Sequence, residues 1–160
     1  MSSKKRFALF VVVVLFAATS WATAQSKDPL VGTWQLNAAK SKYTPGPVPK
    51  SATTTIETAG TGYKFTVHQV SAAGAAQDWS FTTSLDGKPA KVTGNNPNAD
   101  MVTYKRIDAH TFESAQTKGG KETQRQRVVV SADGKTRTVT TTGTDGAGQK
   151  INNVAEYEKK

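Results

Sequence analysis

The chain contains no cysteine and only two histidines, and its one long apolar run is short for a membrane span. Without cysteine, the sequence excludes disulfides, a thiol nucleophile and a bacterial lipoprotein anchor, which needs a thiol at its cleavage site. The chain is nevertheless long enough to bury a sound core without cross-links. His68 and His110 are isolated, with no second histidine or carboxylate at a ligand spacing, so we expect no metal site.

Sequence motifs of catalysis are also missing. There is no G-x-S-x-G elbow and no phosphate-binding glycine loop, and the three glycines of Gly143–Gly148 fit a turn with no helix after it. We therefore predict no catalytic residues, no cofactor and no enzyme activity. A nucleic-acid partner is not expected either, because no stripe of basic and aromatic residues occurs.

The N-terminus has the pattern of an export signal. Lys4-Lys5-Arg6 is a basic region, Phe7–Ala18 is an unbroken apolar run of 12 residues, and Ala22-Thr23-Ala24 is a small-x-small cleavage site. A membrane helix needs about 20 apolar residues. The sequence predicts a cleaved signal over 1–24, a short lead over 25–29 and one domain over 30–160. The product would be periplasmic or secreted, without a stable membrane anchor.

Charge is spread along the predicted domain. Removing the three signal cations from the 21 Lys and Arg leaves 18 against 12 Asp and Glu, a net charge of +6. Such spread charge is typical of a solvated surface that keeps a protein soluble.

Period-2 alternation dominates the rest of the chain, and no helical period lasts beyond about one turn. Glycine-bearing turns, including Asp86-Gly87, Asp133-Gly134 and Asp145-Gly146, separate the runs. The sequence predicts an all-β fold, an up-and-down antiparallel meander of about ten strands closed into a barrel to avoid exposed edges. The ten expected strands are Leu30–Asn37, Ser51–Thr58, Tyr63–Val70, Gln77–Leu85, Lys88–Thr93, Met101–Asp108, Thr111–Thr117, Glu122–Ser131, Thr136–Thr142 and Gln149–Glu158.

Two connections are expected to shape one barrel end. Asn37 is placed to cap a single helical turn, which the three prolines of Thr44–Pro49 must end. This long irregular connection is typical of a lid or rim. Asn95–Asn98 is a rim loop by composition.

Alternation indicates which side chains face inward. Trp34 is expected to close one barrel end as a core residue, with Gly32 and Leu36 on the same face. The remaining inward candidates, which could line a pocket, are Phe65, Trp79, Phe81, Tyr104 and Tyr157.

The opening Gly32-Thr33-Trp34, the strand count and the terminal Tyr157-Glu158-Lys159 resemble the lipocalin and fatty-acid-binding protein superfamily, the calycins. Val31–Asn37 with Lys40-Ser41-Lys42 and Pro45-Gly46-Pro47 is similar to small exported bacterial proteins called lipocalin-like. The resemblance implies a barrel that holds a small ligand.

The resemblance also has departures. Fatty-acid-binding proteins place a ligand arginine two residues before the last tyrosine, where this chain has Ala155, and their helix–turn–helix lid has no room here. Lipocalins carry a C-terminal helix and a basic residue on the last strand over the tryptophan, and neither is expected in this chain.

Three arginines are candidates for an anionic head group. Arg106 shares a face with Tyr104, so it either enters the interior or points to water. Arg125 and Arg127 share one face of their strand, and Val128 and Val130 the other. Either both arginines face inward as a carboxylate site, or both face outward and the valines fill the core.

We therefore expect an exported barrel that binds or carries a small hydrophobic or anionic amphipathic ligand. The alternative is a non-catalytic structural or interaction protein of the cell envelope, with a solid barrel core and a basic, threonine-rich outer surface.

Overall fold

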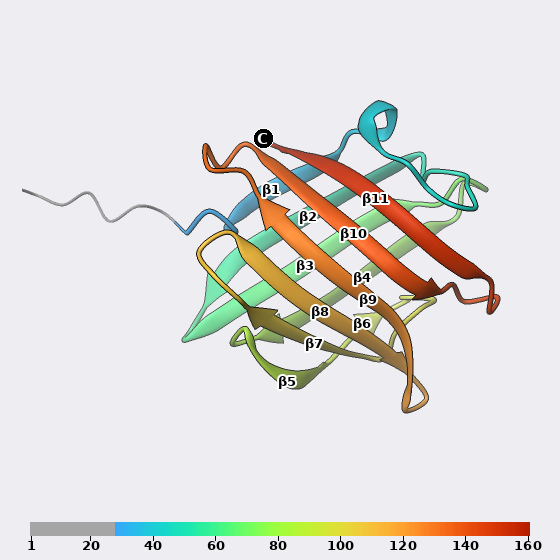
Figure 1. The fold of residues 1–160 in the computed structure, drawn as a ribbon. Coiled ribbons are helices and arrows are strands. Elements are labelled where there is room, and N and C mark those ends of the chain that lie inside the picture. Colours follow the sequence, from blue (N-terminus) through green and yellow to red (C-terminus); the bar gives the residue numbers. More distant parts are fainter. Residues whose placement is uncertain (1–27) are drawn as a thin grey trace, which may run out of the picture.

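The computed structural model describes residues 28–160, which form one antiparallel sheet of 11 strands curled into a nearly closed barrel (Figure 1). The predicted signal peptide and its cleavage site lie outside the described residues. The strands follow the order β5-β7-β8-β9-β10-β11-β1-β2-β3-β4-β6 across the sheet. Their bounds are β1 Gly32–Leu36, β2 Ser51–Ala59, β3 Gly62–Val70, β4 Ala76–Thr83, β5 Asp86–Lys91, β6 Thr93–Gly94, β7 Met101–Arg106, β8 Thr111–Lys118, β9 Lys121–Val130, β10 Thr136–Thr144 and β11 Lys150–Lys159.

The all-β fold and each of the ten expected strands are confirmed, and the eleventh strand arises from a break in one of them. The expected strand Lys88–Thr93 divides at Val92, so that β5 pairs with β7 while β6 pairs with β4. The two free edges of the sheet, β5 and β6, are therefore consecutive in sequence, and they bring the ends of the sheet together.

The expected hairpin at Asp86-Gly87 is wrong. Asp86 already belongs to β5 and pairs with Lys105, whereas β4 ends at Thr83. The chain turns at Leu85, one residue before the expected Asp86-Gly87 turn. Leu85 has a φ of +57°, and its side chain is buried in the core. A two-residue turn with positive φ at both positions does join β8 to β9, at Gly119-Gly120 with φ of +56° and +77°.

Strand β1 joins the first and last parts of the chain within the sheet, because it pairs with β2 on one side and with the last strand, β11, on the other. Trp34 lies opposite Lys159 in this register and is fully buried at one end of the barrel. Leu30, Ile56 and Phe112 are fully buried in the same cluster. Trp34 is thus the core residue expected, whereas Gly32 and Leu36 on its face are only half-buried.

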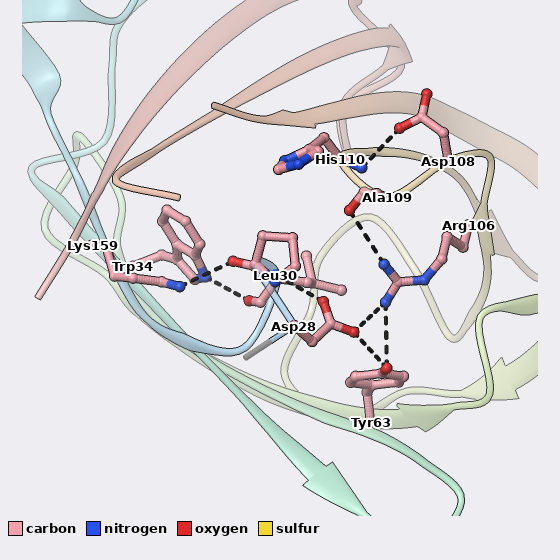
Figure 2. Close-up of polar contacts among 10 residues, drawn as sticks. Asp28, Leu30, Trp34, Tyr63, Arg106, Asp108, Ala109, His110 and Lys159 are labelled. Carbon is pink, nitrogen blue, oxygen red and sulfur yellow. Dashed lines mark hydrogen bonds and ion pairs between the residues drawn. The ribbon is translucent and has the colours of Figure 1, made fainter. Parts of the chain in front are cut away.

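A polar network seals this closed end around the residues that precede β1 (Figure 2). The indole Nε1 of Trp34 donates to the Leu30 carbonyl at 2.9 Å. Asp28 accepts hydrogen bonds from the Leu30 N–H at 3.0 Å, from the Tyr63 hydroxyl at 2.6 Å and from the Arg106 guanidinium. The chain before β1 is therefore fixed across the barrel end by partners from β3 and β7.

The electrostatics of Asp28 reflect this enclosure. Burial by itself raises the pKa of the Asp28 carboxyl, but the hydrogen bonds from Tyr63 and Leu30 and the charge of Arg106 outweigh it. The net effect lowers the pKa below its ordinary value, so Asp28 is ionised where it meets Arg106.

The opposite end is formed by loops. Asn37 caps the short 3-10 helix η1 (Ala38–Lys40), its side chain accepting from the Lys40 N–H at 3.1 Å, as expected. The proline-rich connection from β1 to β2 follows and is held down where Asn153 accepts from the Thr44 N–H at 3.0 Å. In the described part of the chain, no helix has the length and apolar character to span a membrane.

Candidate ligand cavity

An internal cavity of about 360 Å³ lies inside the barrel, between the packed aromatic core and the loop end. Its rim comes from three connections that are distant in sequence: the proline loop after η1, the segment between β6 and β7, and the turn between β10 and β11. The rim residues are Tyr43, Pro45, Gly46, Pro47, Pro49, Asn96, Asn98, Asp145 and Gln149. Both loops expected at a barrel rim therefore border the cavity.

One wall of the cavity is aromatic and is built from β3, β4 and β7. The rings of Phe65 and Phe81 stack with centroids 4.6 Å apart, and the Tyr104 ring lies 4.9 Å from that of Phe65. Trp79 and Val67, which pair across β3 and β4, extend this wall toward the rim. Four of the expected pocket residues, Phe65, Trp79, Phe81 and Tyr104, thus share one surface.

The facing wall, from β8 to β11, carries a row of polar, uncharged side chains. Ser114, Gln126, Thr141 and Asn153 lie in direct cross-strand register, one from each strand, and all four line the cavity. We call this row, in which hydroxyl and carboxamide side chains alternate, the carboxamide belt. Gln116 and Gln124 form a second paired row nearer the rim. Ser114 Oγ and Gln116 Oε1 are buried, with no hydrogen-bond partner among the described residues.

Arg137 on β10 brings a positive charge to the cavity. It is only 4% exposed, yet it lines the cavity. Its guanidinium carbon lies 4.6 Å from the centroid of the Tyr157 ring and 5.5 Å from that of Trp34, so aromatic faces surround the cation. Its Nε has no hydrogen-bond partner in the described chain, where no carboxylate forms an ion pair with it.

The groups around Arg137 offer hydrogen-bond donors. Burial lowers the pKa of Arg137, against the opposing influence of Tyr104 and Tyr157, but an arginine starts so high that it stays charged at neutral pH. Burial raises the pKa of Tyr104 to about 12 and raises that of Tyr157, so both phenols keep their protons. A guanidinium and protonated phenols together form a site that favours an anion.

Arg106 is not at this site. Its side chain does turn inward, but at the closed end, where it bonds to Asp28, donates to the Ala109 carbonyl at 3.4 Å and stacks on Phe112 at 4.6 Å. Because its charge is already paired with a carboxylate, Arg106 anchors the lead to β1 and does not line the cavity.

Arg125 and Arg127 take the outward alternative. Arg125 donates to Glu122 at 2.7 and 2.8 Å, and Arg127 pairs with Glu113 at 3.4 Å, all on the exposed outer face. The valines Val128 and Val130 fill the core instead. A carboxylate site built on this pair of arginines is therefore excluded from the interior.

The expectation of no basic residue over the tryptophan is wrong. Strand β11 extends to Lys159, whose Nζ lies 4.7 Å from the centroid of the Trp34 ring and donates to the Pro29 carbonyl at 3.0 Å. The strand continues past Tyr157, and its pairing with β1 places Lys159 opposite Trp34.

Sequence reasoning missed Arg137, although a signal was present. Thr136, Thr138, Thr140 and Thr142 alternate along β10, so one face of the strand is all threonine. Arg137 and Val139 must share the other face, and the valine marks that face as the inner one. Reading this strand only as threonine-rich hid the arginine.

Comparisons with protein-family models, with curated proteins and with solved structures give no match. The fold is that of a nearly closed antiparallel barrel, compatible with the calycin architecture, and membership of that superfamily remains a hypothesis. Residues 28–160 contain no group of three or more His, Asp or Glu side chains arranged to hold a metal ion.

Proposed function

We propose that this protein is an exported lipocalin-like barrel that binds a small amphipathic anion in its interior cavity. The observation that carries the proposal is a buried arginine, Arg137, which faces a cavity and has no carboxylate partner among the described residues. Burying an unpaired charge is costly, and such charges normally meet an opposite charge. An anionic group on a ligand would supply the missing partner.

The remainder of the cavity supports this proposal. A volume of about 360 Å³ lies within the range of small-molecule sites, and the aromatic wall offers apolar area for affinity. The donors near Arg137 would fix the orientation of the ligand. The Lys159 side chain over Trp34 adds a further point of similarity to lipocalins beyond the G-x-W opening.

The alternative function, a structural or interaction protein of the envelope, requires a solid core. A cavity lined by residues from eight of the strands and three loops speaks against a solid core. We therefore prefer the binding function, in which the outer charges serve solubility.

A probe titration tests the proposed function. The fluorescent anion 8-anilinonaphthalene-1-sulfonate carries an aromatic body and one sulfonate, matching the aromatic wall and Arg137. We expect saturable binding of one probe per folded chain, measured by fluorescence enhancement. Its neutral analogue N-phenyl-1-naphthylamine should bind more weakly, because it leaves Arg137 without an anion. The absence of saturable binding of the sulfonate would contradict the proposal.

A further inference from the structure

The chemistry of the carboxamide belt restricts what the cavity can hold. Its four members, Ser114, Gln126, Thr141 and Asn153, come from four adjacent strands and occupy one level of the barrel. Asn153 accepts from the Thr44 N–H of the rim loop, and in the next row Gln124 donates to the Thr144 carbonyl at 3.2 Å. The belt is therefore part hydrogen-bonded to the protein and part free to meet a ligand.

Two atoms of this wall are buried without a protein partner. Ser114 is 6% exposed and its Oγ is unpaired, and Gln116, a half-buried residue one level nearer the rim, has a buried and unpaired Oε1. Both side chains point into the cavity from β8. Covering such atoms with a hydrocarbon chain costs about 1–3 kcal/mol for each. A purely alkyl tail thus matches this wall poorly.

The opposite wall favours an aromatic ligand. Phe65 and Phe81 stack face to face, with 10° between their planes, and the Tyr104 ring packs against both. Phe81 is only half-buried, so a further ring can pack against this cluster in offset or edge-to-face contact. Polar groups on the edge of such a ring can meet the facing wall.

From these two facing walls we infer the class of the ligand: a ring-bearing anion with hydroxyl groups along one edge, not an alkyl-chain lipid. This inference rests on the proposed function and specifies it. The anionic group meets Arg137, the ring lies against Phe65 and Phe81, and the polar edge bonds to Ser114 Oγ and Gln116 Oε1.

Displacement of bound 8-anilinonaphthalene-1-sulfonate by three monoanions tests the inference. These are 3,4-dihydroxycinnamate, with a ring and hydroxyls; cinnamate, with the ring alone; and decanoate, with an alkyl chain. We expect dihydroxycinnamate to displace the probe at a concentration at least about tenfold below the concentration that cinnamate requires. Decanoate should be the weakest competitor. A site built to bond a hydroxyl discriminates strongly against the analogue that lacks it.

Variants assign the preference to Ser114 and Gln116. In Ser114→Ala combined with Gln116→Met, which keeps the side-chain volume, we expect the dihydroxycinnamate preference over cinnamate to fall about tenfold or to vanish. Gln35→Met, on the exposed face of β1, is the matched control and should leave the preference unchanged. Thermal unfolding checks that the double variant is folded, and removing unpaired polar atoms should not lower its stability.

Three outcomes overturn the inference. These are displacement of the probe by decanoate as effective as that by dihydroxycinnamate, equal displacement by dihydroxycinnamate and cinnamate in the wild type, and a preference for dihydroxycinnamate that survives in the double variant, which would leave water as the partner of Ser114 and Gln116. Each of these leaves the proposed function standing, because the anionic probe still binds. Failure of the probe itself to bind would instead overturn the proposed function.

Discussion

Replacing Arg137 by methionine is expected to stabilise the ligand-free barrel and to remove its preference for anions. Methionine keeps the length of the side chain among Trp34 and Tyr157 but removes a buried charge that has no ion-pair partner in the described chain. Replacing buried charged groups by apolar ones of similar size is often stabilising by about 1–4 kcal/mol. Loss of the contacts with the aromatic rings offsets part of this gain.

Binding should change in the opposite direction. Losing one partner of a buried charge pair costs about 2–5 kcal/mol, so the affinity for 8-anilinonaphthalene-1-sulfonate should fall about 30-fold or more. Binding of neutral N-phenyl-1-naphthylamine should persist. Urea denaturation and fluorescence titration measure the two effects.

The matched control is Arg127→Met. Arg127 is exposed on the outer face and pairs with Glu113, so its loss should change stability by less than about 1 kcal/mol and leave both probes bound. Equal anion affinity in Arg137→Met and the wild type would show that the buried arginine is not the anion site.

Replacing Trp34 by alanine is expected to cost about 3–5 kcal/mol of unfolding free energy, the range for a fully buried large aromatic side chain. The change opens a cavity at the closed end and removes the hydrogen bond to the Leu30 carbonyl. Because domains of this kind are stable by only about 5–15 kcal/mol, the variant should lose a large part of its stability. Urea denaturation at neutral pH measures it.

A companion variant at the same barrel end separates packing from charge. Asp28→Asn keeps the shape but breaks the ion pair with Arg106, at an expected cost of about 1–3 kcal/mol. Since the folded pKa of Asp28 is lowered, its contribution is present above about pH 4 and is lost as the pH falls through the folded pKa. The difference between wild type and Asp28→Asn should therefore shrink in acid, whereas the deficit of Trp34→Ala should not follow this titration. A difference that stays constant down to pH 2 would contradict the role given to Asp28.

Much of the fold could be predicted from the sequence because its signals are local. Alternation along a strand and paired glycines at a turn, as in Gly119-Gly120, depend only on neighbouring residues. The inward aromatic residues Phe65, Trp79 and Phe81 followed from the same alternation. The break at Val92 could not be predicted in this way, because it depends on which distant strands the two halves pair with.

The candidate site was harder to predict, because it depends on pairing between strands. Arg106, Arg125 and Arg127 stand on strands with the right alternation, but their acidic partners decide their role, and these partners lie on other elements or several residues away. Arg137 differs from them in having no such partner in the described chain. The carboxamide belt exists only through the register of β8 to β11, which no single strand reveals.

The central claim, that the barrel is a container, is tested most directly by native mass spectrometry of the protein purified without detergent from the cells that make it. The spectrum is compared with that of the same sample after denaturation. We predict a recurring additional mass of small-molecule size that denaturation removes and that is absent from Arg137→Met. A ligand-free mass that does not shift after incubation with 8-anilinonaphthalene-1-sulfonate would contradict the account and favour a barrel that works through its outer surface.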